Sequence, residues 1–378
     1  MNRISSVFLS IVCLALCAGV ASAEPMFLSR QYARCTSCHY SPTGGGLLTP
    51  YGRSLSGKEL STTGRTVAPS NADSDDVAER EEAFLFGALG GALGPLQLGV
   101  DLRPAHLHVS YPGGSAGQNL WMNADVLAAV QAGEWTFYGE VGRQPTGFGK
   151  IDSYEYWVAH QSSGGIGIRA GRFLPTYGVR FADHTAFNRR VLGFDVYDQV
   201  YGVEISRTSE RNLLQVTISP GRADSIINDD GSRAFMTSGR YEVDLSSGTS
   251  VVASGLFRNA SSLQARQGAG GVALGIAPNT HVSIWTEGNV LLVQGANGAA
   301  YTVVNETSVE AVRGVWLKFS PQLRTNPGNL SGGVIRGAFE VDVLPRTHWN
   351  VDGSYYVDRD RTNDFVTKTF LIQLHIYL

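Results

Sequence analysis

Two cysteines and a histidine near the N-terminus are spaced so that they could hold a metal-containing cofactor. The chain reads Cys35-Thr36-Ser37-Cys38-His39, with the imidazole directly after the second thiol. This is the CxxCH spacing of covalent c-type haem attachment. Two thiols three positions apart reach the two vinyl groups on one porphyrin edge, and the next histidine lies under the iron. The motif predicts one haem c, attached to Cys35 and Cys38 and ligated by His39.

Two other uses of a cysteine pair fit this sequence less well. A thioredoxin-like redox pair needs a βαβ setting, and the surrounding sequence has none. A disulfide across two intervening residues would be strained and would leave His39 without a role.

The residues after the motif are suited to a flat cofactor. Glycines at positions 44–46 let the backbone approach a macrocycle closely, and Leu47, Leu48 and Tyr51 can cover its faces. The alternative is a flexible glycine loop without a ligand.

The first 23 residues predict export from the cytoplasm. Arg3 precedes an apolar run at positions 7–20, and Ala21-Ser22-Ala23 form a small-residue cleavage site. Lipidation at Cys17 is the alternative, although a leucine precedes that cysteine. The full chain has 30 basic and 33 acidic residues, and cleavage of the signal peptide would remove one basic residue, Arg3, and no acidic one. This mild acidity argues against nucleic acid as a partner.

Composition and hydropathy divide the rest of the chain. With 45 glycines, 43% apolar and 17% charged residues, the balance favours an all-β architecture. After the signal peptide (1–23) we expect a haem-binding head (24–60), a polar linker (61–82) and a β-domain (83–378). The head is too short to build its own core, so we expect it to pack inside the lumen or at the periplasmic mouth of that domain.

Period-two alternation dominates the β-domain. Phe339, Val341 and Val343 alternate with Glu340 and Asp342, and similar runs are separated by turn residues. Such a pattern fits a soluble sandwich or a membrane barrel with its apolar face toward lipid. About 14–16 candidate strands, runs close to the roughly 9–11 residues that cross a bilayer, and a strand at the C-terminus favour a transmembrane antiparallel β-barrel.

Several aromatic residues stand near the ends of these runs, as interfacial girdles would require, although aromatics are also simply good strand formers. They are Trp121, Trp135, Tyr138, Tyr154, Tyr156, Trp157, Tyr355 and Tyr356.

Two segments depart from the alternation. Residues 83–100 carry no charge over a length that would suit a transmembrane helix, but five glycines and Pro95 favour two strands, the second beginning near Leu96. Residues 174–199 form a long charged loop, which we expect to fold into the lumen as a constriction. Because it lies there, His184 is our choice as distal haem ligand, with five-coordinate or water-ligated iron as the alternative.

These features resemble the fused outer-membrane porin-cytochromes, whose best-known members are the iron-oxidising porin-cytochromes. The head "FLSRQYARCTSCHYSPTGGGLLTPYGRSL" resembles theirs closely, and "AGRFLPTYGVRFADHTAFNRR" resembles a segment of related single-haem barrels. The Pro-Thr-Gly-Gly-Gly stretch differs from the heads of the iron oxidisers. Elsewhere the similarity is one of architecture.

The resemblance implies an electron-transfer protein rather than a bond-making enzyme, with extracellular iron as one candidate substrate. Cys35, Cys38 and His39 would carry the haem. The barrel would lie in outer-membrane lipid and relay electrons between an extracellular donor or acceptor and a periplasmic carrier such as a soluble cytochrome. Two alternatives remain: a porin whose haem head is a sensor or structural element, and a soluble periplasmic haem protein with a β-sandwich.

Overall fold

The computed structural model describes residues 25–31, 34–63, 95–143, 151–195, 198–222, 234–260 and 265–377. The predicted signal peptide, most of the predicted linker and residues 83–94 lie outside these ranges. Four short helical segments come first: η1 (Pro25–Arg30), α2 (Cys35–Cys38), α3 (Pro50–Leu55) and η2 (Ser56–Leu60). All but one of the later elements are strands.

The strands form one antiparallel sheet that closes on itself, because β1 pairs with both β2 and β17. Their bounds are β1 (Leu96–Tyr111), β2 (Gly114–Ala132), β3 (Trp135–Arg143), β4 (Ile151–Asp152), β5 (Tyr156–Gln161), β6 (Ile166–Phe173), β7 (Val200–Thr208), β8 (Asn212–Arg222), β9 (Met236–Ser246), β10 (Thr249–Arg258), β11 (Gln267–Asn279), β12 (Val282–Val293), β13 (Ala300–Val312), β14 (Val315–Asn326), β15 (Asn329–Arg346), β16 (Trp349–Asp360) and β17 (Phe365–Tyr377).

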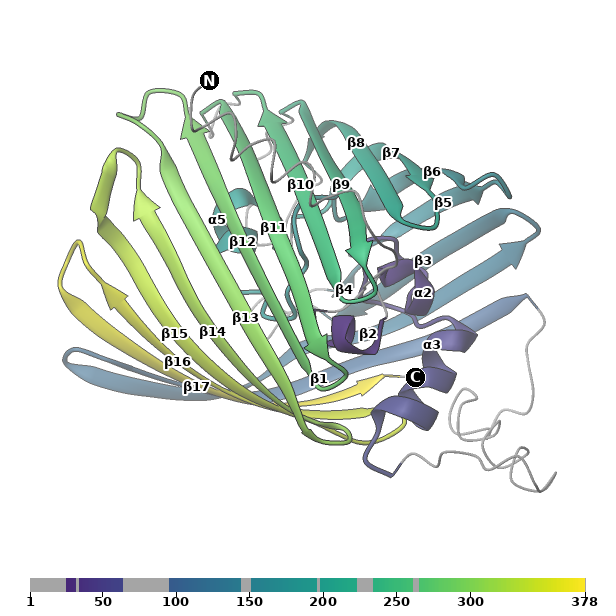
Figure 1. Cartoon of the computed structure of the whole chain (residues 1–378), viewed down its shortest axis with the longest axis horizontal. Coiled ribbons are helices and arrows are strands. Elements are labelled where there is room, and N and C mark those ends of the chain that lie inside the picture. The colour runs from purple at the N-terminus through teal and green to yellow at the C-terminus, as the bar shows by residue number, and fades with distance from the viewer. Residues whose placement is uncertain are drawn as a thin grey trace.

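Within the described chain the barrel has 16 strand positions, because β4 and β5 both pair with β3 and share one position. Figure 1 shows the closed wall, with the head inside its curve. The closed barrel confirms the predicted fold class and rules out the two-sheet sandwich. No helix among the described residues is long and apolar enough to span a membrane.

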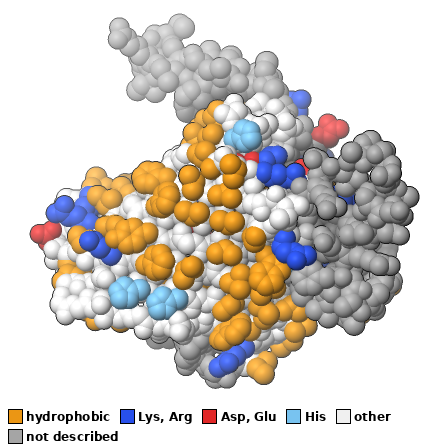
Figure 2. All heavy atoms as spheres, turned by 90° about the horizontal axis from the view of Figure 1, so that it is seen from below, with side chains coloured by type: hydrophobic (Ala, Val, Ile, Leu, Met, Phe, Trp, Pro, Cys, Tyr) orange, Lys and Arg blue, Asp and Glu red, His pale blue; other side chains and the backbone are white. Residues whose placement is uncertain are grey.

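The alternation predicted from sequence determines which side chains face outward. Phe339 is 47% exposed, whereas Asp342 on the same strand is 3% exposed and faces the lumen. Phe339 pairs in register with Phe319 and Tyr355 on the neighbouring strands, so aromatic rings form a row across the outer surface. Hydrophobic side chains are spread over the outer face in Figure 2. This is the exterior that a lipid-facing barrel requires.

The girdle prediction is half wrong. Trp121, Trp135, Tyr156 and Tyr355 are exposed on the exterior, but Tyr138, Tyr154, Trp157 and Tyr356 are buried. Two of the buried rings, Tyr138 and Trp157, stack with centroids 4.9 Å apart and pack in a cluster with residues of the head. A filled lumen accepts aromatic side chains that an open aqueous pore would leave in water.

The two ends of the barrel differ. At the end where β1 begins and β17 stops, the connections are short turns such as residues 133–134, 280–281 and 313–314. At the other end, residues 174–199 join β6 to β7 and contain the helix α5 (Phe187–Leu192).

Candidate functional site

The head is attached to the short-turn end of the barrel by polar contacts around its circumference. Arg30 forms an ion pair with Glu310 of β13, and Arg34 donates to the carbonyl of Ser209 in the β7–β8 turn at 2.6 Å. Thr62 donates its backbone N–H to Leu344 of β15 at 2.8 Å. These contacts fix the head across the mouth of the barrel.

Further contacts join the head to the two strands that close the barrel. The Arg53 guanidinium donates to the carbonyl of Leu98 on β1 at 2.6 Å. The hydroxyls of Ser56 and Tyr377, the latter on β17, are hydrogen-bonded at 2.7 Å.

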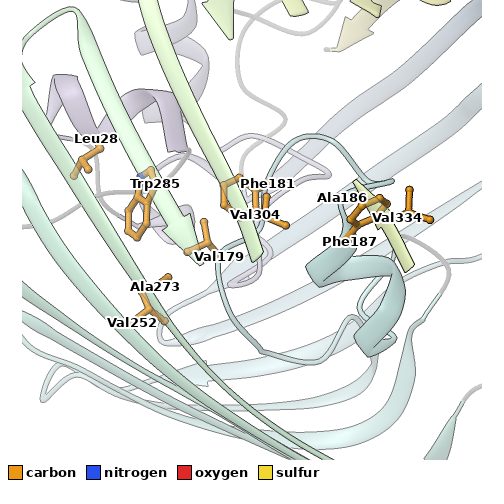
Figure 3. Packing of buried hydrophobic residues seen from close by; sticks show 10 residues of the cluster. All are labelled: Leu28, Val179, Phe181, Ala186, Phe187, Val252, Ala273, Trp285, Val304 and Val334. Atoms are coloured by element: carbon orange, nitrogen blue, oxygen red, sulfur yellow. The ribbon is translucent and has the colours of Figure 1, made fainter. Parts of the chain in front are cut away.

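Apolar side chains of the head complete three clusters with the barrel, as expected for a segment too short for its own core. Tyr40 and Leu47 pack in the cluster that contains Trp157 and Phe173. Met26, Leu55 and Leu60 pack on Trp316 and Leu344. Leu28 joins a cluster with Trp285 and part of the inward loop (Figure 3).

The two cysteines lie one helical turn apart. Cys35 and Cys38 are the first and last residues of α2, so their side chains lie on one face of a single turn. His39 ends that turn in an extended conformation and donates its backbone N–H to the carbonyl of Cys35 at 2.8 Å. It also forms a β-bridge with Leu48, which brings residues 40–47 back as a closed loop.

Three consecutive glycines shape that loop. Gly44, Gly45 and Gly46 have φ values of +78°, +75° and +63°, a left-handed region in which other residues are strained. A Cβ atom on Gly44 would lie 3.0 Å from the Sγ atom of Cys35, and one on Gly46 would overlap the Tyr138 hydroxyl. Glycine therefore leaves space beside Cys35 and lets the loop pack against the barrel wall.

The environment of His39 suits the predicted iron ligand. Its Nδ1 atom is buried and has no hydrogen-bond partner among the described residues. Burial, reinforced by the positive charge of Arg180, lowers the pKa of His39 to about 4. The imidazole is therefore neutral at neutral pH, the form that binds a metal. These observations fit a haem, whose presence stays a prediction.

The predicted inward loop crosses the lumen. The backbone N–H of Val179 donates to Glu287 on β12 at 2.7 Å, and Arg336 on β15 donates to the Thr185 hydroxyl at 2.7 Å. In Figure 3, Val179 and Phe181 point into the interior, and Phe187 on α5 lies beside Val334 of β15. The inward placement is thus confirmed for the described part of this segment, residues 174–195 and 198–199.

The loop and the head meet inside the barrel. The Nη1 atom of Arg180 donates to the carbonyl of Thr43 at 2.8 Å and also contacts the carbonyl of Gly44. A small pocket of about 40 Å³, partly open to solvent, lies beside this junction. Cys35 lines it from the head, and Arg180 and Arg189 line it from the loop.

Glu155, in the break between β4 and β5, bonds to three parts of the site. Its carboxylate accepts from the Ser41 hydroxyl of the head at 3.1 Å, from the Leu174 N–H of the loop at 3.2 Å, and from the Trp157 indole at 3.3 Å. Sequence reasoning missed Glu155 and Arg180. The run of three glycines at positions 44–46 was the signal in the sequence for a tight loop whose carbonyls need a donor such as Arg180.

His184 lies in the inward loop, with its Nδ1 atom 3.5 Å from a carboxylate oxygen of Asp195. Within the described ranges it forms no hydrogen bond or ion pair with the head. The structure thus brings Cys35, Cys38 and His39 together, and the role of His184 as distal ligand stays a prediction. Among the described residues, no group of three or more His, Cys, Asp or Glu side chains is arranged to hold a metal ion directly.

Comparison with known proteins identifies the fold. No family model matches the sequence, and no curated protein matches it significantly. Among solved structures, OprB of Pseudomonas putida is similar with a TM-score of 0.59 and 7% identity over 75% of this chain and 94% of that one. The anion-selective porin from Comamonas acidovorans gives 0.57 at 10% identity over 75% and 99%. The outer-membrane channel DcaP of Acinetobacter baumannii gives 0.56 at 10% over 75% and 97%. The chain therefore has a porin-like barrel.

Proposed function

We propose that this protein is an outer-membrane monohaem cytochrome that relays electrons across the membrane through its porin-like barrel. The observation that carries the proposal is the CxxCH motif, held on one face of a helical turn inside the lumen. Haem c supplies a reversible one-electron couple when it is bound. The protein's part is then to position the cofactor, exclude bulk water and provide axial ligation.

Each residue of the motif has a distinct role in this proposal. Cys35 and Cys38 hold the porphyrin covalently, and His39 offers a neutral imidazole to the iron. Gly44 leaves the space next to Cys35, while Arg180 fixes the glycine loop by binding its carbonyls. His184 remains our proposed distal ligand.

The difference between the two ends of the barrel supports an orientation. Bacterial outer-membrane barrels have short turns on the periplasmic side and longer loops outside. In that orientation the head lies at the periplasmic mouth, within reach of a carrier such as a soluble cytochrome. The loop between β6 and β7 enters from the outer side, where an extracellular donor or acceptor, with iron as one candidate, would exchange electrons.

A second candidate function is a channel in which the head is a structural or sensing element. The similarity to porins favours it, as do the arginines that face the pocket. The two functions differ in what crosses the membrane: an electron for the first, a solute for the second.

The test uses the full-length protein, extracted from outer membranes in detergent and placed in liposomes that contain a redox dye. We expect a haem-stained band, a c-type absorption spectrum and oxidation or reduction of the dye by an external partner. The Cys35→Ala, Cys38→Ala variant should keep its heat-modifiable gel migration but lose the haem stain and dye turnover. Turnover at the parent rate in that variant would remove the electron-transfer function. Solute flux in the same liposomes reports on the channel.

A further inference from the structure

The pocket beside Cys35 contains hydrogen-bond donors without acceptors. Arg189 and Trp285 are 4% and 3% exposed, and both line it together with Arg240. The Nη2 atom of Arg189, the Nε1 atom of Trp285 and the Nε atom of Arg240 are buried and have no hydrogen-bond partner among the described residues. Buried donors are almost always hydrogen-bonded, so three at one pocket need an explanation.

The remaining contacts of Arg189 fix its orientation. Its Nη1 atom donates to the carbonyl of Phe181 at 2.7 Å, and its Nε atom donates to the carbonyl of Phe194 at 3.3 Å. Burial and the neighbouring Arg180 lower the pKa of Arg189 to about 9, so it remains charged at neutral pH. The guanidinium is thus held in place with one nitrogen still available.

The pocket has the charge of an anion site. Arg180, Arg189 and Arg240 line it, and no aspartate or glutamate does, although Arg240 also forms an ion pair with Glu242 outside the pocket. Guanidinium groups bind carboxylates with strong, charge-assisted hydrogen bonds. The expected occupant is therefore a group with negatively charged acceptor oxygens.

We infer that this pocket receives the propionate carboxylates of the haem, an assignment that rests on the proposed function. Cys35, one of the two attachment points, lines the same pocket. The propionates leave the porphyrin on the side away from the vinyl groups that the cysteines bind. Arg189 and Arg240 would then act as positioning residues for the cofactor, and Trp285 would supply a third donor.

The test compares the haem reduction potential of the full-length parent, Arg189→Gln and Arg189→Lys. Arg190→Gln is the matched control, because Arg190 lies on the same helix but is exposed. Loss of a positive charge beside the propionates favours ferric haem, so Arg189→Gln should lower the potential. We expect at least a tenfold change in the ratio of reduced to oxidised haem at a fixed ambient potential, which is about 59 mV for one electron. Arg189→Lys should change it less, and Arg190→Gln should leave it unchanged.

The outcomes separate this assignment from the proposed function. Normal haem staining with the same potential in parent and Arg189→Gln would overturn the assignment and leave the electron relay intact. A parent protein without covalent haem would overturn both. A shift that appears only when phosphate is added would assign the pocket to a free anion instead. If Arg189→Gln does not fold, Trp285→Phe, which keeps an aromatic ring but removes the donor, carries the test, and an unchanged potential there overturns the assignment.

Discussion

The Nη1 atom of Arg180 lies 2.8 Å from the carbonyl oxygen of Thr43. Arg180 belongs to the loop that enters the lumen from one end, and Thr43 belongs to the head that enters from the other. The same guanidinium also contacts the carbonyl of Gly44. This junction makes the two segments one continuous body inside the barrel.

Replacement of Arg180 by glutamine should loosen the head. The guanidinium makes two partly buried, charge-assisted bonds, each worth about 1.5–3 kcal/mol, and the amide of glutamine is neutral and too short to replace them. We expect faster proteolysis of the head in detergent. N-terminal sequencing of the fragments shows where cleavage occurs. Arg190→Gln removes the same charge from an exposed position and should be cleaved at the parent rate. Equal cleavage of the two variants would contradict a role for the junction.

Replacement of Gly46 by alanine should destabilise the docked loop. The left-handed conformation costs about 1–2 kcal/mol for a residue with a Cβ atom, and that atom would also overlap the Tyr138 hydroxyl. The double variant Gly46→Ala, Tyr138→Phe removes the overlap and should recover part of the lost thermal stability.

Gly45→Ala carries the same conformational cost without the overlap with Tyr138, although its added atom would lie 3.0 Å from the Nη2 atom of Arg180. Melting temperatures of all four proteins in one detergent give the comparison. An absence of any recovery in the double variant would mean that the loop does not pack on Tyr138.

Replacement of Glu155 by glutamine should weaken the contact between head, loop and wall. One carboxylate accepts three hydrogen bonds, and an amide retains a single acceptor oxygen. We expect a loss of about 2 kcal/mol in the free energy of unfolding, within the range for bonds to charged groups. Glu134→Gln, at an exposed turn, should unfold at the parent denaturant concentration. Tryptophan fluorescence in a denaturant titration measures the difference.

Replacement of Phe339 by arginine tests the lipid-facing surface. Phe339 lies within the outward row of rings on β14, β15 and β16, and an arginine facing the centre of a bilayer costs about 2–4 kcal/mol. We expect lower folding yield into lipid vesicles and unfolding at lower urea, while Phe339→Leu should behave nearly as the parent does. Arginine tolerated as well as leucine would show that this face does not contact lipid.

The barrel could be predicted because alternation is a local signal. Phe339 and Asp342 reveal their faces through the period of two, and the break in that period at residues 174–199 marks the inward loop. The cysteine spacing is equally local, so Cys35, Cys38 and His39 could be singled out from a few letters, although the helical turn that carries the cysteines was not predicted.

The contents of the lumen could not be predicted in the same way. The period of two places Trp157 on the inner face, opposite to its neighbour Tyr156, but it does not indicate that Trp157 packs against the head. The head residues that Arg180 and Glu155 contact are more than a hundred positions away in sequence. Such pairings follow from how two segments meet inside the closed wall, and a period of two carries no information about that.

The bonds from Arg53 to β1 and from Ser56 to β17 bear on the order of assembly. These strands are the first and last of the barrel, and their pairing is the seam that must form before the wall is complete. Because the head bonds to both sides of that seam, its docking stabilises closure, and closure in turn retains the head. Residues near the start of the chain thus help to secure its final strand in the finished protein.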